Sequence, residues 1–475
     1  MTNAPFVSAD AIRAMFSGAM SDMYKSEVPQ YAALSELVAD INREALAKDP
    51  ELAMRLKQAG DLDRLGVERH GAIRVGTPEE LSTIRRLFAV MGMAPVGYYD
   101  LSTAGVPVHS TAFRPVGDEA LRRNPFRIFA SLLRLDLIDD SELRREAAAI
   151  LARRNIFTLR CLELLAMFEG RGGLDEAQAR EFASEAVATF RWRNEATVPA
   201  EVYYNLRKAH PLIADVVCFK GPHINHLTLQ ALDIDAVQLA MSTRNMNPKA
   251  IIEGPPRRKR AILLRQTSFK ALPEPIVLKG ADGSIEAGAH SARFGEVEQR
   301  GVALTAKGRA LYDHLLAAAN DSVRAASEGS NGAAYAEELR RQFEAFPDDE
   351  TALRDEELAF FRYSPTADGL RHAGAPSLPR EMAGLVQAGY VRIDPIIYED
   401  FLPVSAAGIF QSNLGDAGQR NFAAGANREA FEAALGIAVL DELELYAEAE
   451  ARSRAASFKA LGLDAEPERQ GATGQ

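Results

Sequence analysis

Two histidines three residues apart, His223 and His226 in the segment GPHINHLT, give the densest group of potential metal ligands in the chain. On a helix, residues at this spacing share a face and could hold one metal together. On a strand they point to opposite faces, so only one can enter a site. The Gly221-Pro222 turn and the β-rich flanks favour the extended form. We therefore expect one metal ligand and one supporting residue, with the spacing leaving open which histidine is which.

A third histidine, His70, begins the β-rich segment HGAIR, and Arg74 follows four residues later. On a strand these two side chains project from one face, with their Cα atoms ~13 Å apart at ~3.3 Å per residue. A metal on His70 and the planar donor fork of Arg74 could then bracket a short dicarboxylic acid. The alternative is that Arg74 forms an ordinary surface salt bridge, which would contribute little.

The segment FGEVEQRG supplies carboxylates, because Glu296 and Glu298 share one face of a predicted strand with Phe294. A carboxylate on a partly apolar face is costly unless it is paired or bound to metal. A solvated edge strand is the alternative. Two histidines and one carboxylate from separate strands make a facial triad, which leaves adjacent positions open and suits iron(II). Zinc, nickel or manganese would accept the same donors, and composition does not choose among them.

Other polar residues are weaker candidates. His314 and His372 lie in charged surroundings, so we expect both at the surface. Four residues beside predicted strands are candidate pocket residues, although a structural role is the default for each: His109, Gln266, Ser268 and Lys270.

The composition is that of a globular protein, with 475 residues of which 47% are apolar and 25% charged. Two cysteines, Cys161 and Cys218, are too few for a disulfide framework, so we expect both to be reduced. The first residues do not show the basic region followed by an apolar region that marks a signal peptide. No segment approaches the ~18 consecutive apolar residues of a membrane span. These features predict a cytoplasmic protein with no membrane partner.

The net charge of −11, from 55 basic and 66 acidic side chains, argues against a nucleic-acid partner. The basic run PPRRKRA at 255–261 is interpreted as a solvated loop before the strand AILLRQTSF. If the substrate is an anion, its pocket needs a local arginine or lysine to overcome the repulsion from the negative net charge of the protein. The sequence leaves the oligomeric state open.

The order of predicted elements indicates an α+β fold, with a sheet core heavily wrapped by helices. A β-α-β-β order is predicted over 70–115. The run FRIFASLLRLDLI is predicted to be helical, and IADVVCFKGPHINHLT and DIDAVQLAM are predicted to be β-rich. We predict a single elaborated catalytic domain over 1–465 and a disordered tail at 466–475. Its predicted parts are N-terminal helices (8–60), a first β module (66–120), a helical insertion (126–195), a second β module with metal ligands (200–302), a helical segment (303–350) and a C-terminal unit (385–460).

Several long segments closely resemble one known family, the 2-oxoadipate dioxygenase/decarboxylases or D-2-hydroxyglutarate synthases, a divergent branch of the vicinal oxygen chelate superfamily. The resemblance extends from about residue 6 to about residue 460. It implies a vicinal oxygen chelate-like sheet core of paired βαβββ modules around a metal site. The segments that carry it are ERHGAIRVGT, VGYYDLS, GVPVHSTAFRP, FKGPHINHLT, LLRQTSFKAL, ARFGEVEQRG and YEDFLPVSAAGIFQSNLG.

The resemblance also implies roles for individual residues, and it selects His226 over His223 and Glu296 over Glu298. The implied iron(II) ligands are His70, His226 and Glu296. The implied substrate contacts are His70, Arg74, His226, the main chain at Val404 and the neighbouring Ser405.

The implied reaction is the decarboxylation and intramolecular hydroxylation of 2-oxoadipate by dioxygen, giving D-2-hydroxyglutarate and carbon dioxide in lysine catabolism. The implied partners are thus a small 2-oxo dicarboxylate and dioxygen. Two other functions stay open. One is a glyoxalase-like lyase or isomerase that uses zinc or nickel without dioxygen, and the other is a metal-dependent dicarboxylate-binding protein.

Overall fold

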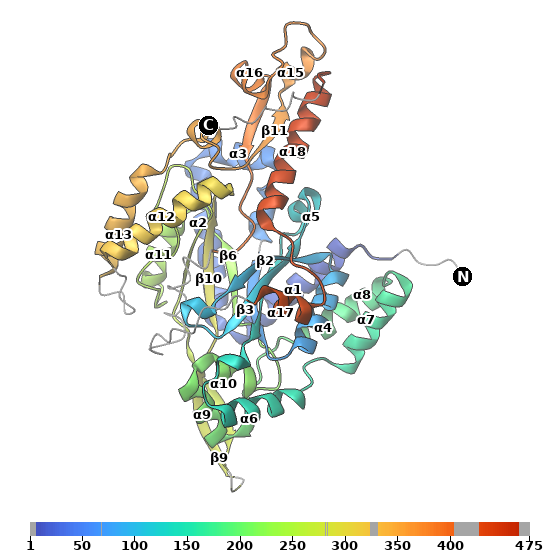
Figure 1. Cartoon of the computed structure of the whole chain (residues 1–475), viewed down its shortest axis with the longest axis vertical. Coiled ribbons are helices and arrows are strands. Elements are labelled where there is room, and N and C mark those ends of the chain that lie inside the picture. The colour runs from blue at the N-terminus through green and yellow to red at the C-terminus, as the bar shows by residue number, and fades with distance from the viewer. Residues whose placement is uncertain are drawn as a thin grey trace.

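A seven-stranded mixed sheet runs through the centre of the molecule (Figure 1). The computed structural model describes residues 6–67, 69–280, 282, 284–323, 331–402 and 427–464. The strand order across the sheet is β2-β3-β4-β1-β6-β10-β7. These strands are β1 (Arg69–Val75), β2 (Met93–Asp100), β3 (Val108–Pro115), β4 (Arg127–Leu133), β6 (His226–Gln230), β7 (Leu264–Ser268) and β10 (Phe294–Arg300).

The first module, β1-α4-β2-β3-β4, has the expected βαβββ order. Its helix α4 (Pro78–Val90) begins after Thr77, whose side chain accepts a hydrogen bond from the backbone N–H of Glu80. The β-α-β-β order predicted over 70–115 is confirmed. The predicted helical insertion at 126–195 is wrong at its start, because residues 127–133 form β4. This strand lies between β1 and β3 and is buried on both faces, so its apolar run lacks the alternation that marks a half-exposed strand.

The second module contains β6, β10 and β7, and its strands are arranged like those of the first. The two modules meet where β1 pairs with β6. β1 pairs in parallel with β4, and β6 pairs in parallel with β10, while β1 and β6 run antiparallel. Glu253 bridges to Gln266 of β7, and Pro248 bridges to Phe269 just after β7. This segment thus lies beside β7 as β2 lies beside β3.

The β prediction for two segments near this module is wrong. IADVV lies in helix α10 (Pro211–Val217), and DIDAVQLAM lies largely in helix α11 (Ile234–Thr243). Both helices have side-chain caps, because His210 accepts from the backbone N–H of Leu212 and Asp233 accepts from that of Ala236. These local start signals outweigh the β-branched content of the two runs.

The two faces of the sheet differ in character, which follows from the alternation of side chains along each strand. One face is apolar and packs against the N-terminal helices α1 (Ala9–Glu27) and α2 (Pro29–Lys48), confirming the helical prediction for 8–60 together with α3 (Pro50–Ala59). The other face carries the polar candidates. The apolar face is formed by Ile73, Val75, Ile128, Ala130, Leu132, Leu227, Leu229 and Val297.

Two small sheets extend the molecule along its long axis. The sheet β5-β8-β9 lies at one end with α9 (Ala200–Ala209), and the pair β11-β12 lies at the other with α18 (Glu442–Ala460) (Figure 1). Among the described residues of 303–350, the helical prediction is confirmed in α12 (Ala306–Ser322) and α13 (Gly332–Gln342). The small-sheet strands are β5 (Glu195–Pro199), β8 (Pro273–Lys279), β9 (Ile285–Ser291), β11 (Phe361–Pro365) and β12 (Val391–Pro395).

Helices wrap the sheet on most sides, as the α+β prediction requires. In the described ranges, no helix combines the length and the apolar character that crossing a membrane requires. The predicted tail at 466–475 lies outside the described residues. The remaining helices are α5 (Asp118–Arg123), α6 (Ser141–Ala152), α7 (Leu159–Arg171), α8 (Glu176–Ala188), α9 (Ala200–Ala209), α12 (Ala306–Ser322), α13 (Gly332–Gln342), α14 (Glu350–Asp355), α15 (Ala367–Arg371), α16 (Met382–Gln387), α17 (Arg428–Leu435) and α18 (Glu442–Ala460).

Candidate metal centre

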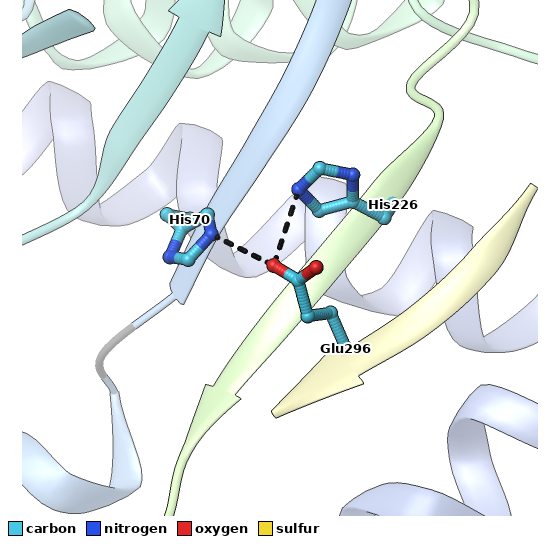
Figure 2. Close-up of side chains that lie close together, drawn as sticks. All are labelled: His70, His226 and Glu296. Atoms are coloured by element: carbon cyan, nitrogen blue, oxygen red, sulfur yellow. Dashed lines mark ion pairs between the residues drawn. The ribbon is translucent and has the colours of Figure 1, made fainter. Parts of the chain in front are cut away.

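Three adjacent strands bring His70, His226 and Glu296 together on the polar face of the sheet (Figure 2). His70 on β1 is paired in register with Thr228 on β6, and Thr228 is paired with Glu296 on β10. His226 is the first residue of β6, two positions before Thr228, so it projects from the same face. The register of the central strands therefore sets the cluster.

The distances within this cluster fit a metal ion. Oε1 of Glu296 lies 3.3 Å from Nε2 of His70 and 3.7 Å from Nε2 of His226. One ligand atom from each residue lies within 4.8 Å of the other two, and no second such group occurs among the described residues. Nε2 of His226 is buried without a hydrogen-bond partner in the described ranges. Two imidazole nitrogens and a carboxylate oxygen converging in a buried place are a typical donor set for a divalent transition metal.

The electrostatics of the site favour the protonation states that a metal needs at His226 and Glu296 but not at His70. Burial lowers the pKa of His226 to about 4 despite the Glu296 carboxylate, and the charge of Arg74 acts in the same direction as burial. For Glu296, burial opposes ionisation, but the two histidines outweigh it and lower its pKa. For His70, burial is outweighed by Glu298 and Glu296, which raise its pKa. A neutral His226 and an ionised Glu296 are ready for coordination, whereas a metal must displace the proton that His70 favours.

Gly71 allows β6 to approach β1 closely at the site. A Cβ added there would lie 2.6 Å from Cδ1 of Ile224 and 2.9 Å from the carbonyl oxygen of His226. A side chain at this position would therefore push His226 away from His70. This is a close-approach role that only glycine fills without a shift.

The two glutamates on β10 have different surroundings. Glu298 is buried, so the solvated-edge alternative is wrong. Its Oε1 accepts hydrogen bonds from Arg127 at 3.2 Å and from Arg300 at 2.7 Å, and its Oε2 lies 3.1 Å from Nδ1 of His70. Glu296 instead faces both histidines and accepts from the Thr228 hydroxyl at 2.9 Å. The geometry groups Glu296, not Glu298, with the two histidines.

His223 and His226 also have different surroundings. The extended prediction for this segment is confirmed, since residues 222–225 have no helical structure and β6 begins at His226. Nε2 of His223 lies 3.2 Å from Oδ1 of Asp215 rather than in the cluster with Glu296. The spacing left open which histidine enters the site. The structure places His226, at the start of β6, in the cluster.

Arg74 lies on the same face of β1 as His70, next to the strand position that pairs with His226. Its Nη1 donates to Oδ2 of Asp215 at 2.8 Å, and its side chain is 16% exposed. The alternative of an ordinary surface salt bridge does not describe this contact, because Asp215 is buried.

Of the four weaker pocket candidates, two lie on the polar face of the sheet and two do not. Gln266 and Ser268 on β7 pair with Glu298 and Glu296, and both are buried on the polar face. Lys270 is exposed. His109 pairs with Leu132, which places it on the apolar face, where its ring contacts Phe431. His314 and His372 are exposed, as predicted. The predicted contacts at Val404 and Ser405 lie outside the described residues.

Sequence reasoning missed a capping segment, residues 398–402, beside the ligands. Phe401 packs edge-on against His70, with ring centroids 4.7 Å apart. Glu399 accepts hydrogen bonds from Arg64 at 2.9 Å and from Arg127 at 2.7 Å. Arg127 also reaches Glu298, so one chain of buried charges connects the cap to His70. The run YEDF gave a signal, two acids between aromatic residues, but its partners are distant in sequence.

A second missed group is the buried pair of Lys249 and Glu253. Their ion pair lies beside β7, and Nε2 of Gln266 donates to Oε2 of Glu253 at 3.0 Å. Asp215 was missed as well, although it is the only charged residue in the run PLIADVVCF, which indicates a buried, partnered carboxylate.

Comparison with known proteins gives consistent results. The family model described as 2-oxoadipate dioxygenase/decarboxylase matches residues 16–413. The protein of that name from Pseudomonas putida is 57% identical over 458 residues, covering 96% of this chain and 98% of the relative. The one from Escherichia coli strain K12 is 56% identical over 448 residues, covering 94% and 98%. A more distant one from Mycobacterium bovis is 37% identical over 454 residues, covering 94% and 98%.

The same relationship holds between structures. The crystal structure of the Pseudomonas putida hydroxyglutarate synthase in complex with 2-oxoadipate superposes with a TM-score of 0.89 at 56% identity, covering 96% of this chain and 99% of the other. The chain belongs to the 2-oxoadipate dioxygenase/decarboxylase family.

Proposed function

We propose that this protein is an iron(II)-dependent 2-oxoadipate dioxygenase/decarboxylase that produces D-2-hydroxyglutarate and carbon dioxide. The observation that carries the proposal is the convergence of His70, His226 and Glu296 on the face that also holds Arg74. Membership of the family and the 2-oxoadipate complex of a relative support the substrate. The place of this reaction in lysine catabolism stays a prediction of the resemblance.

His70, His226 and Glu296 are the residues that would hold iron(II). Two nitrogens and one oxygen on one side of a metal leave adjacent positions for two further ligands. Iron(II) held there would supply binding of dioxygen and of a chelating 2-oxo acid. The ring of Phe294 stacks on His226 and that of Phe401 packs on His70, so the ligand rings are screened from water. A carboxylate and a neutral imidazole in this dry setting need no proton loss before they coordinate.

Arg74 would bind the distal carboxylate of the substrate. The protein as a whole repels anions, with a net charge of −11, so a local cation is required. A guanidinium matches a carboxylate with two parallel hydrogen bonds. Because Arg74 is fixed on the same strand as His70, its reach sets the length of diacid that fits. The main chain at Val404 and the side chain of Ser405 remain proposed contacts.

The overall reaction is balanced without a further reductant. One 2-oxoadipate and one dioxygen contain the atoms of one D-2-hydroxyglutarate and one carbon dioxide. The substrate therefore supplies all the electrons, and no added 2-oxoglutarate is required.

Metal replacement tests this function against its nearest alternative. Apoprotein is loaded in parallel with iron(II), zinc or nickel and given 2-oxoadipate in air-saturated buffer. The proposal requires oxygen consumption with iron and none with zinc or nickel. Product formation with zinc or nickel in the absence of oxygen would instead indicate a glyoxalase-like lyase or isomerase. Binding of 2-oxoadipate without turnover on any metal would indicate a dicarboxylate-binding protein.

A further inference from the structure

The salt bridge of Arg74 belongs to a larger buried group. Nη1 of Arg74 contacts Oδ2 of Asp215 at 2.8 Å. The other carboxylate oxygen, Oδ1, lies 2.8 Å from Nε2 of His290 and 3.2 Å from Nε2 of His223. Asp215, His223 and His290 are all buried. One carboxylate is thus held by two imidazoles on one side and by the guanidinium on the other.

The two imidazoles are themselves fixed. Nε2 of His290 lies 2.8 Å from Asp215, and because an ionised carboxylate only accepts, this nitrogen is the donor. Nδ1 of the same ring lies 3.1 Å from the Tyr203 hydroxyl. The ring of His290 lies parallel to Trp192, at 10° and 6.1 Å between centroids, and His223 packs edge-on against the same indole at 4.6 Å. Asp215 therefore has little freedom to move, and neither has the arginine that it holds.

This arrangement leaves Arg74 able to bind a second carboxylate. A guanidinium carries five N–H donors in a planar fork, and the contact with Asp215 uses Nη1. His223 and His290 favour the ionised form of Asp215, and they hold its pKa well below the ordinary value even though burial opposes this. The carboxylate thus stays a hydrogen-bond acceptor for Arg74, and the charge of Arg74 still acts on the site, where it helps to lower the pKa of His226.

We propose that Asp215, braced by His223 and His290, is a positioning residue that fixes the guanidinium of Arg74 and so sets the preference for a six-carbon 2-oxo diacid. This inference rests on the proposed function, because it concerns how Arg74 meets the distal carboxylate. Two effects oppose each other. Asp215 partly neutralises Arg74, which weakens anion binding, but it also orients the fork. We expect orientation to dominate, since a misplacement of about 1 Å in a positioning group can lower a reaction rate by roughly 100-fold.

Ligand binding without turnover tests the proposal. Iron(II)-loaded full-length protein is titrated calorimetrically under argon with 2-oxoadipate and with 2-oxohexanoate, which has a methyl group in place of the distal carboxylate. We expect Asp215→Asn to raise the Kd for 2-oxoadipate by roughly tenfold or more and to leave the Kd for 2-oxohexanoate within about twofold. In an Arg74→Ala background, Asp215→Asn should have no further effect on either ligand, because coupled residues are non-additive.

Two further variants separate positioning from folding. Asp235→Asn is a matched control, because Asp235 is also a helix carboxylate paired with an arginine on the sheet, Arg265 at 2.7 Å, but on the opposite face. This variant should change neither Kd. His290→Phe removes one hydrogen bond to Asp215 and keeps a ring between Trp192 and Phe219. It should give a smaller loss with the same selectivity for the diacid, and it serves as the test if Asp215→Asn does not fold.

The outcomes are distinct. An equal loss for both ligands, an unchanged or lower Kd for 2-oxoadipate, or an equal effect of Asp215→Asn in the Arg74→Ala background would overturn the positioning role. Wild-type protein that does not prefer 2-oxoadipate over 2-oxohexanoate would instead count against the proposed function itself. A preference for 2-oxoadipate that survives Arg74→Ala would move the distal contact away from Arg74, and the inference would fail with it.

Discussion

Oε2 of Glu298 lies 3.1 Å from Nδ1 of His70, on the side of the ring away from the three-residue cluster. Nε2 of the same ring lies 3.3 Å from Glu296. His70 is thus held between two carboxylates on one strand, one at each ring nitrogen. A carboxylate beside the free nitrogen of a metal-binding histidine fixes the tautomer and the ring orientation. Nε2 of His70 is therefore the atom presented to a metal.

The first prediction concerns this contact. Glu298→Gln should lower iron(II) affinity by roughly 10–100-fold, because the ring of His70 loses its orienting charge. Competition with a coloured chelator measures the affinity. Asp235→Asn, on the opposite face of the sheet, is the control and should bind iron as tightly as the wild type. If Glu298→Gln also bound iron normally, the orienting role of Glu298 would be wrong.

The second prediction separates the two histidines of GPHINHLT. His226→Ala should lose bound iron, since it removes one of three protein ligands, whereas His223→Ala should retain iron because His223 contacts Asp215 instead. Elemental analysis of protein reconstituted with iron(II) gives the metal content. Full occupancy in His226→Ala with loss in His223→Ala would reverse the assignment.

The third prediction concerns substrate recognition. Arg74→Ala should lower kcat/KM for 2-oxoadipate by roughly tenfold or more while the iron content stays normal, because a charge-assisted bidentate contact is lost. Steady-state oxygen uptake, with metal analysis of the same sample, provides both values. Unchanged kinetics would exclude Arg74 as the distal contact.

The fourth prediction concerns the capping segment at 398–402. Burial opposes ionisation of Glu399, but Arg64 and Arg127 outweigh it and lower its pKa to about 2. Glu399→Gln should lower the free energy of unfolding at pH 7 by roughly 3 kcal/mol, since it removes the buried carboxylate that the guanidinium groups of Arg64 and Arg127 share. Urea unfolding measures the change. Glu448→Gln, which breaks an exposed helical pair, should have no measurable effect.

The pH dependence of this variant has a definite sign. The pKa of Glu399 is lower in the folded state than the ordinary value of about 4.3, so its stabilisation is fully present above that value. It should be lost as the pH falls from about 4.3 towards 2, and the difference between wild type and Glu399→Gln should shrink over that range. A difference that stayed constant down to pH 3 would contradict the buried ion pair.

Hydrophobic periodicity was sufficient to predict a helix or strand where the local start and stop signals indicate the same element. Helix α4 has Thr77 before it and Pro78 at its first position, and the observed helix begins where these signals predict. It failed for β4, because a central strand buried on both faces has no alternation to detect. It failed for α10 and α11 because the caps at His210 and Asp233 outweigh the β-branched content of the two runs.

The site shows the same limit. Residues on strands could be assigned to faces from spacing alone, which grouped His70 with Arg74 and Glu296 with Glu298. Choosing Glu296 over Glu298 requires the register between β6 and β10, a property of pairs of strands that one sequence does not contain. The partners of Arg74 and Glu399 lie more than a hundred residues away in the chain, so no local pattern could find them.

The central claim is that iron(II) on this cluster couples dioxygen to the decarboxylation and hydroxylation of 2-oxoadipate. Its most direct test is the stoichiometry of a closed reaction with iron-loaded protein, 2-oxoadipate and no added 2-oxoglutarate. Oxygen uptake, carbon dioxide release and D-2-hydroxyglutarate are measured together. The account predicts equal molar amounts of all three. Release of carbon dioxide without oxygen uptake, or formation of glutarate in place of the hydroxy acid, would contradict it.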